Sequence, residues 1–208
     1  MIKDFDLLQR ANNDYTTIDL EHAEELAYRE LIDSIRYISL GDECGVMGNI
    51  ANIITYKGRF YIQEEQFDRV FIYDDTGRCL KKIDNKGRGP GEYLRIESID
   101  INTEKEELML VDGMSDKLFF YDLDGNFKSI HSIRYFQTEN TLCLRDSVFL
   151  HISAPSQNFG NEGLYGYALV LSKGNENFLK GYRYLPLQVG YKGGGQIFKG
   201  YERSCYHP

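Results

Sequence analysis

The hydrophobic residues of this chain fall into many short runs separated by turns that contain Gly, Asp and Asn. Two of these runs, Val70 to Tyr73 and Leu118 to Tyr121, are apolar at every position. A strand with one solvent-exposed face alternates apolar and polar residues, whereas a strand that is covered on both faces does not. The pattern therefore predicts an all-β protein whose sheets pack face to face.

The sequence also contains an internal repeat. Residues 69–79, RVFIYDDTGRC, align without a gap on residues 117–127, KLFFYDLDGNF, at an offset of 48 residues. Upstream positions correspond at offsets of 46 to 48, pairing Ile50, Ile53, Phe60 and Ile62 with Ile96, Ile99, Leu108 and Leu110. A weaker third copy runs from Ser147 to Leu179. A repeat of this length indicates a modular architecture.

Each repeat contains four strand-sized pieces, which in the first are about 50–56, 60–63, 69–73 and 79–83. Four-stranded antiparallel sheets packed between neighbours are the blades of a β-propeller. The absence of Trp excludes the WD40 class. We therefore predict an incomplete propeller of about 3 to 4 blades. The expected blades are 50–93, 94–133, 134–183 and an incomplete 184–208.

Residues 1–49 precede the repeats and have a different pattern. Asp19 can cap a short N-terminal helix that runs to Asp33, because apolar residues follow it at helical spacing. Ile35 to Leu40 alternates and predicts a strand that would close the ring.

One segment resembles a known family. Residues 81–93, KKIDNKGRGPGEY, follow residues 73–77, YDDTG, and Arg69–Val70 lies where NHL repeats carry Arg and an apolar residue. Together they resemble the signature of bacterial six-bladed β-propellers related to NHL-repeat proteins. The resemblance implies an exported lipoprotein of the periplasm or outer membrane, without an assigned activity. The chain itself begins with no apolar segment typical of a signal peptide.

The length bears on assembly. From Ile50 to Pro208 there are 159 residues, or about 3.3 repeats, where a ring needs roughly six blades. This predicts either a truncated product of a longer gene or self-association through the open blade faces.

Charge and cysteine spacing narrow the chemistry. The net charge of −8 argues against a nucleic-acid partner, and no apolar run is long enough for a transmembrane segment. Cys44, Cys79, Cys143 and Cys205 form no CxxC pair, so we expect neither a zinc knuckle nor a disulfide scaffold. Cys79 takes the place of Phe127 and is predicted to be a small core residue.

No metal or cofactor is expected. The four His residues show no spacing typical of a metal site. Asp122–Gly125 is expected to be a hairpin turn rather than a calcium loop.

The most unusual loop is 86–93. Its glycines allow close backbone approach, and Lys86, Arg88, Glu92 and Tyr93 could present charge and amide donors to an anionic or polar ligand. The alternative is a structural crossing between blades in which Arg88 pairs with Glu92 or with a neighbouring blade. Propeller geometry places this loop beside 64–68 and 112–116, whose candidate binding residues are Gln66, Phe67, Asp112 and Met114. The alternative for these loops is a solvated surface without a special role.

Three functions stay open. The first is a non-catalytic binding or scaffold protein of the bacterial cell envelope that recognises a peptide, a glycan or a protein through these loops. The second is an NHL-like lyase or hydrolase with its active site in the axial channel, which would need His or carboxylates clustered there. The third is a truncated remnant without activity.

Overall fold

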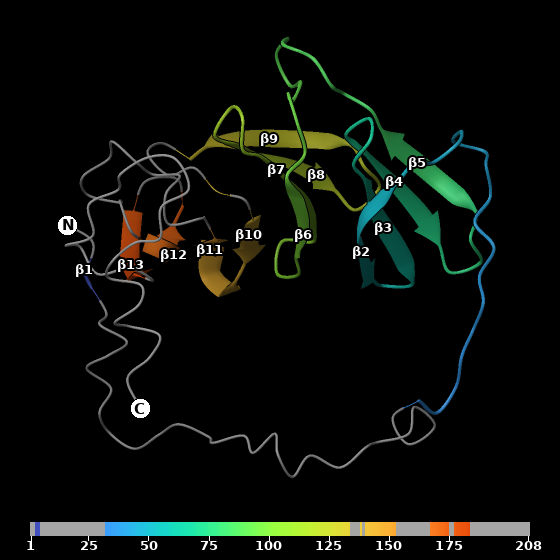
Figure 1. The fold of residues 1–208 in the computed structure, drawn as a ribbon, viewed down its shortest axis with the longest axis horizontal. Helices are drawn as coiled ribbons and strands as arrows, with labels where there is room; N and C mark the ends of the chain where they lie inside the picture. The colour runs from blue at the N-terminus through green and yellow to red at the C-terminus, as the bar shows by residue number, and fades with distance from the viewer. Residues whose placement is uncertain are drawn as a thin grey trace, which may run out of the picture.

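The computed structural model describes residues 3–4, 32–133, 138, 140–152, 167–174 and 177–183. These residues form three antiparallel sheets that follow one another along an arc (Figure 1). Blade 1 contains β2 (Ile50–Tyr56), β3 (Arg59–Glu64), β4 (Arg69–Asp74) and β5 (Cys79–Ile83). Blade 2 contains β6 (Ser98–Asn102), β7 (Glu107–Asp112), β8 (Lys117–Asp122) and β9 (Phe127–Ser132). Blade 3 contains β10 (Asn140–Cys143), β11 (Val148–Ile152), β12 (Tyr167–Lys173) and β13 (Asn177–Arg183).

The blades are arranged as in a β-propeller. In each blade the four strands pair in sequence order, and the first strand of blade 2, β6, contacts both β2 and β10 along the inside of the arc (Figure 1). The two-residue strand β1 (Lys3–Asp4) adds in parallel to β13, and a short 3₁₀ turn, Arg145–Ser147, precedes β11. The predicted all-β propeller blades are therefore confirmed.

The 48-residue repeat is visible in the strand pairing. Ile53 pairs with Ile62 in blade 1, and Ile99 pairs with Leu110 in blade 2. A bulge lies between Ile72 and Tyr73, and its counterpart lies between Phe120 and Tyr121. Val70 and Leu118 belong to separate sheets. The two units thus share this bulge and much of their pairing register, whereas the irregularity between Ile50 and Asn52 in blade 1 has no counterpart between β6 and β7.

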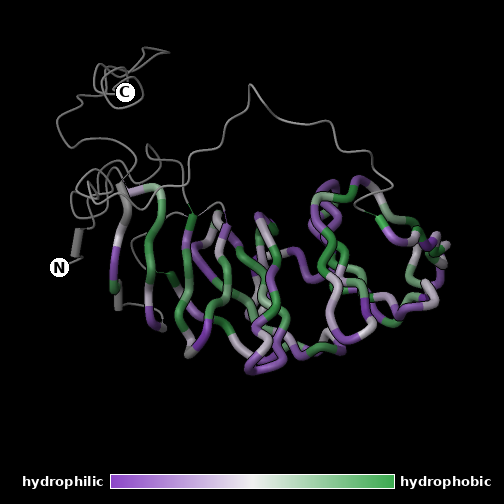
Figure 2. Tube along the Cα trace, turned by 90° about the horizontal axis from the view of Figure 1, so that it is seen from below, coloured by the Kyte–Doolittle hydropathy of each residue, from purple (hydrophilic) through white to green (hydrophobic). Residues whose placement is uncertain are grey.

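The hydrophobic core lies between the blades. Blade 1 contributes Tyr61, Val70, Ile72 and Ile83 to the first interface, where blade 2 contributes Leu108, Leu110, Phe119 and Tyr121. The other face of blade 2, which includes Met109, Leu118 and Phe120, packs against Phe149 and Val170 of blade 3. Since both faces of blade 2 are covered, apolar residues occupy consecutive positions of β8. The strands carry much of the hydrophobic sequence, and many of their connecting turns are hydrophilic (Figure 2).

The hairpins at the outer strands confirm the predicted turns. Gly77 and Gly125 have φ values of 87° and 80°, which a side chain would disfavour. The Asp122 carboxylate accepts hydrogen bonds from the backbone of Asp124 and Asn126, at 3.0 and 2.8 Å. Asp122–Gly125 is therefore a hairpin turn.

The structure does not support the helix and the strand that were expected in the N-terminal segment. The helix expected from Asp19 to Asp33 lies outside the described residues except for its last two positions, which are not helical. The strand expected at Ile35 to Leu40 is wrong: this segment pairs with no strand in the described part of the chain. Tyr37 is 92% exposed. Alternation favours a strand only where a free sheet edge is within reach, and here the chain runs along the outside of blade 1 instead (Figure 1).

Candidate binding rim

The crossing from blade 1 to blade 2, residues 84–97, lies against loops of both blades. The Tyr93 hydroxyl donates to the Asp68 carbonyl oxygen at 2.7 Å, and Lys86 forms an ion pair with the Asp68 carboxylate. On the other side, the Leu94 amide donates to Asp112 Oδ2 at 2.8 Å. The structure thus brings loops 64–68 and 112–116 together with the crossing. We call these three segments the loop rim.

The Gly-rich part of the crossing folds back on itself. The Gly87 amide donates to the Tyr93 carbonyl at 2.9 Å, and the Glu92 carboxylate accepts from the Gly89 amide at 2.7 Å. A Cβ at Gly87 would lie 1.9 Å from Glu92 Oε2, so a side chain there would displace the Glu92 carboxylate from its present position. We expected the amides of this loop to be available to a ligand. The structure corrects this expectation for Gly87 and Gly89, because their amides already donate to Tyr93 and Glu92 of the same loop.

Tyr93 and Asp112, which were expected to contact a ligand, are buried instead. Tyr93 is fully buried, packs edge-on against Phe119, and has its pKa raised by burial. Asp112 is 1% exposed. Its carboxylate accepts from the Met114 and Ser115 amides, both at 3.1 Å, and from the Ser115 hydroxyl at 2.7 Å. Both residues hold the rim in shape.

Two further residues that hold the rim loops in place, Glu64 and Asp68, were not predicted from the sequence. Glu64 is fully buried and accepts from the Gln66 and Phe67 amides, as Asp112 does for the next loop. Asp68 is 6% exposed, and its Oδ1 accepts from the Ile96 amide at 3.1 Å. The signal was present in the repeat, since Glu64 and Asp112 are 48 residues apart and both are acidic.

The remaining candidates face solvent. Met114 is 66% and Phe67 is 46% exposed, and the Arg69 guanidinium lies 4.5 Å from the Phe67 ring centre. Gln66, Lys86, Arg88 and Glu92 are also exposed. The pairing of Arg88 with Glu92 considered for the structural crossing is not found, and among the described residues the Arg88 guanidinium has no hydrogen-bond or ion-pair partner.

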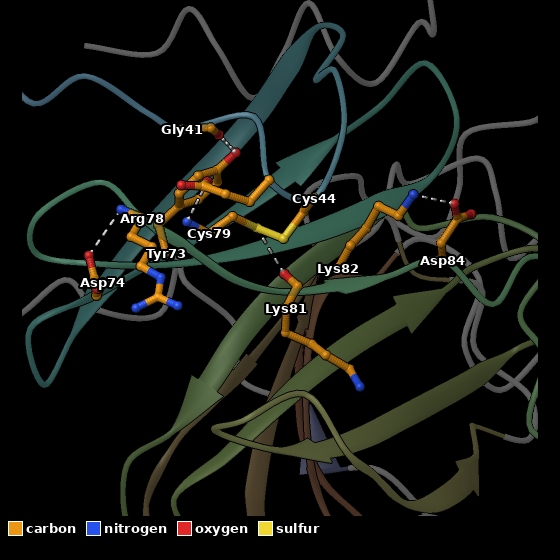
Figure 3. Close-up of a disulfide and its surroundings, with 10 residues drawn as sticks. Gly41, Cys44, Tyr73, Asp74, Arg78, Cys79, Lys81, Lys82 and Asp84 are labelled. Atoms are coloured by element: carbon orange, nitrogen blue, oxygen red, sulfur yellow. Dashed lines mark hydrogen bonds and ion pairs between the residues drawn. A yellow bond between two sulfur atoms is a disulfide. The ribbon is translucent and has the colours of Figure 1, made fainter.

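Cys79 forms a disulfide with Cys44, 35 residues earlier (Figure 3). The two Cα atoms are 5.9 Å apart, a distance typical of disulfides. Cys79 is buried as predicted, but it is cross-linked rather than a free core residue. The spacing of the four cysteines fixes no pairing, so this disulfide could not be assigned from the sequence, because it depends on where the N-terminal segment lies.

Blade 3 has a buried polar network. His151 Nδ1 lies 2.9 Å from Thr141 Oγ1, and its Nε2 lies 2.8 Å from Ser172 Oγ. Burial lowers the pKa of His151 to about 4. Nearby, burial raises the pKa of the Cys143 thiol to about 12, which makes it an unreactive thiol. Across the described ranges, no three His, Cys, Asp or Glu residues are grouped in a way that could hold a metal ion.

The fold and the rim define the class: an all-β protein of propeller blades in which loops of neighbouring blades meet at one rim. Residues 15–205 match the family described as a domain of unknown function, DUF4934. The chain belongs to this family.

A similar solved structure agrees on the fold. It is a protein of Bacteroides fragilis that is described as exported, with 19% identity and a TM-score of 0.65. The match covers 76% of this chain and 44% of that protein. At this identity the likeness shows the fold alone.

Two further structures are less similar. A DUF4221 family member from Bacteroides vulgatus has 9% identity and a TM-score of 0.41, covering 64% of this chain and 41% of that one. The β-propeller domain of Cps50 from Myceliophteria thermophila has 15% identity and a TM-score of 0.38, covering 76% and 46%. No curated protein matches the sequence. None of the helices in the described part of the chain has the length and apolar character needed to cross a membrane.

Proposed function

We propose that this chain is part of a non-catalytic propeller-type binding or scaffold protein of the bacterial cell envelope, and that it recognises a peptide, a polysaccharide or a protein through its loop rim. The observation that carries the proposal is the division of the rim into two sets of residues. Asp68, Tyr93 and Asp112 are buried and hydrogen-bonded, whereas Phe67, Met114 and Arg88 are exposed. Rigid loops that present apolar and cationic side chains lose little conformational entropy on binding.

The exposed set suits an amphipathic ligand. An arginine without a partner among the described residues can bind a carboxylate or a sugar hydroxyl, and Met and Phe side chains supply adaptable apolar contact. The six-bladed NHL-like ring and the lipoprotein anchor implied by the sequence resemblance belong to the same proposal.

The Cys44–Cys79 disulfide supports a location outside the cytoplasm. Structural disulfides persist in oxidising compartments such as the bacterial periplasm and the cell surface. The similar Bacteroides fragilis protein is described as exported, which agrees with this location.

Arrays of envelope peptides and bacterial polysaccharides, probed with the full chain, test the proposal. Arg88→Ala and Met114→Ala should each weaken binding by about tenfold for a ligand found in this way. The matched controls are Arg78→Ala, an exposed arginine on the β4–β5 turn at the opposite ends of the strands, and Leu80→Ala, which is 43% exposed on β5.

The pattern across the four variants decides the result. Loss of binding in the two rim variants with retention in both controls supports the rim. Equal binding by all four variants, or equal loss in all four, would show that the ligand is held elsewhere.

A further inference from the structure

The outer face of blade 1 is built like a face that receives another blade. Ile62, Phe71 and Tyr73 correspond by the repeat to Leu110, Phe119 and Tyr121. In blade 2 these three residues form the interface with blade 1. In blade 1 their counterparts are 0 to 1% exposed although no described blade lies on that side.

A short segment covers this face instead. Residues 41–47, which we call the strap, place Cys44 and Met47 against Ile62, Phe71 and Tyr73. The disulfide joins the centre of the strap to Cys79 on β5 (Figure 3). We propose that Cys44–Cys79 is a redox latch for the strap: the strap stays on this face of blade 1 when the disulfide is oxidised and opens locally when it is reduced. This inference does not depend on ligand binding by the rim.

The non-covalent contacts of the strap are few. The Gly41 amide donates to the Gly77 carbonyl at 2.8 Å, the Tyr73 hydroxyl donates to the Gly41 carbonyl at 3.2 Å, and the Cys79 amide donates to Glu43 at 3.3 Å. Val46 is 84% exposed, so the strap buries only part of its apolar surface. Segments with few buried contacts open locally in native proteins. Without the disulfide, the strap would have few buried contacts, so we expect it to open locally.

The latch is also accessible to a reductant. Cys44 is half-buried, whereas Cys79 is 7% exposed, so we expect a reductant to attack Cys44 Sγ rather than Cys79 Sγ. The thiolate of a dithiol attacks Cys44 Sγ and the Cys79 thiolate leaves. The second thiol of the reductant then displaces Cys44, which gives two protein thiols and one cyclic disulfide of the reductant. Two electrons and two protons pass to the protein.

Hydrogen exchange and alkylation of the full chain test the latch, before and after treatment with a dithiol. After reduction we expect amide exchange in residues 41–47 to rise by about tenfold or more, and Cys44 and Cys79 to alkylate with iodoacetamide. Strands β6 to β9 should remain protected. Cys143 is the internal control, since its buried thiol should stay unmodified in the native chain.

A variant separates the link from the reductant. Cys44→Ser without reductant should reproduce the faster exchange of the strap, and Val46→Ser, at an exposed position that makes no disulfide, should not. Unchanged exchange of residues 41–47 after reduction would overturn the proposal. An equal rise in β6 to β9 would overturn it as well, because the disulfide would then hold the whole fold rather than the strap.

Discussion

His151 makes the stability of this fold depend on pH in a direction that can be worked out. The ring is 2% exposed between Thr141 and Ser172, and burial lowers its pKa from 6.5 to about 4. The unfolded chain therefore binds a proton that the folded chain excludes. The contribution of the neutral ring is fully present above pH 6.5 and is lost as the pH falls toward the folded pKa of about 4.

The size of this effect follows from the two pKa values. Between pH 8 and pH 5, an unfolded pKa of 6.5 and a folded pKa of about 4 give a loss of about 2 kcal/mol. Urea unfolding of the full chain, followed by far-ultraviolet circular dichroism at both pH values, measures it. From pH 8 to pH 5, the free energy of unfolding of His151→Gln should fall by about 2 kcal/mol less than that of the wild type.

His131 provides the control, because its pKa is also lowered, first by burial and then by Lys105. The His131→Gln variant should retain the component of the pH dependence that belongs to His151. If His151→Gln and the wild type lose the same stability from pH 8 to pH 5, the reasoning is refuted. A His151 ring proton signal that titrates near 6.5 in the folded chain would refute it directly.

Three further outcomes are expected from the geometry. Tyr93→Phe removes the hydroxyl bonded to Asp68, so the free energy of unfolding in urea should fall by about 1–2 kcal/mol; an unchanged value would mean that water replaces this bond. Asp112→Ala leaves the Leu94 amide and two loop amides without their acceptor and should cost about 3 kcal/mol, with Asp112→Asn costing less; equal effects would remove the role of the carboxylate. Ile72→Ala, at a fully buried position between blades 1 and 2, should lower the melting temperature by an amount equivalent to about 3 kcal/mol, whereas Leu80→Ala on the exposed side of β5 should stay within about 0.5 kcal/mol.

The loop rim could be predicted from the sequence only in part. That its three loops lie together was predictable, because strand order in a blade fixes which turns share an edge. The sequence pattern also suggested that Tyr93 and Asp112 bind a ligand, yet both are buried. An aromatic or acidic residue in a glycine-rich loop has the same sequence pattern whether it points to solvent or to a neighbouring blade, and only the packing of the two blades decides between these.

The sequence by itself determined the blades. The periodicity of two in strands, the continuous apolar runs and the 48-residue repeat are local properties, so the strands, their hairpins and the covered faces of blade 2 follow from them. The tertiary structure alone decided the course of residues 32–49, the pairing of Cys44 with Cys79 and the inward direction of Tyr93 and Asp112. Each of these depends on contacts between segments that are far apart in the chain, and such contacts are fixed by how the sheets pack rather than by any pattern of neighbouring residues.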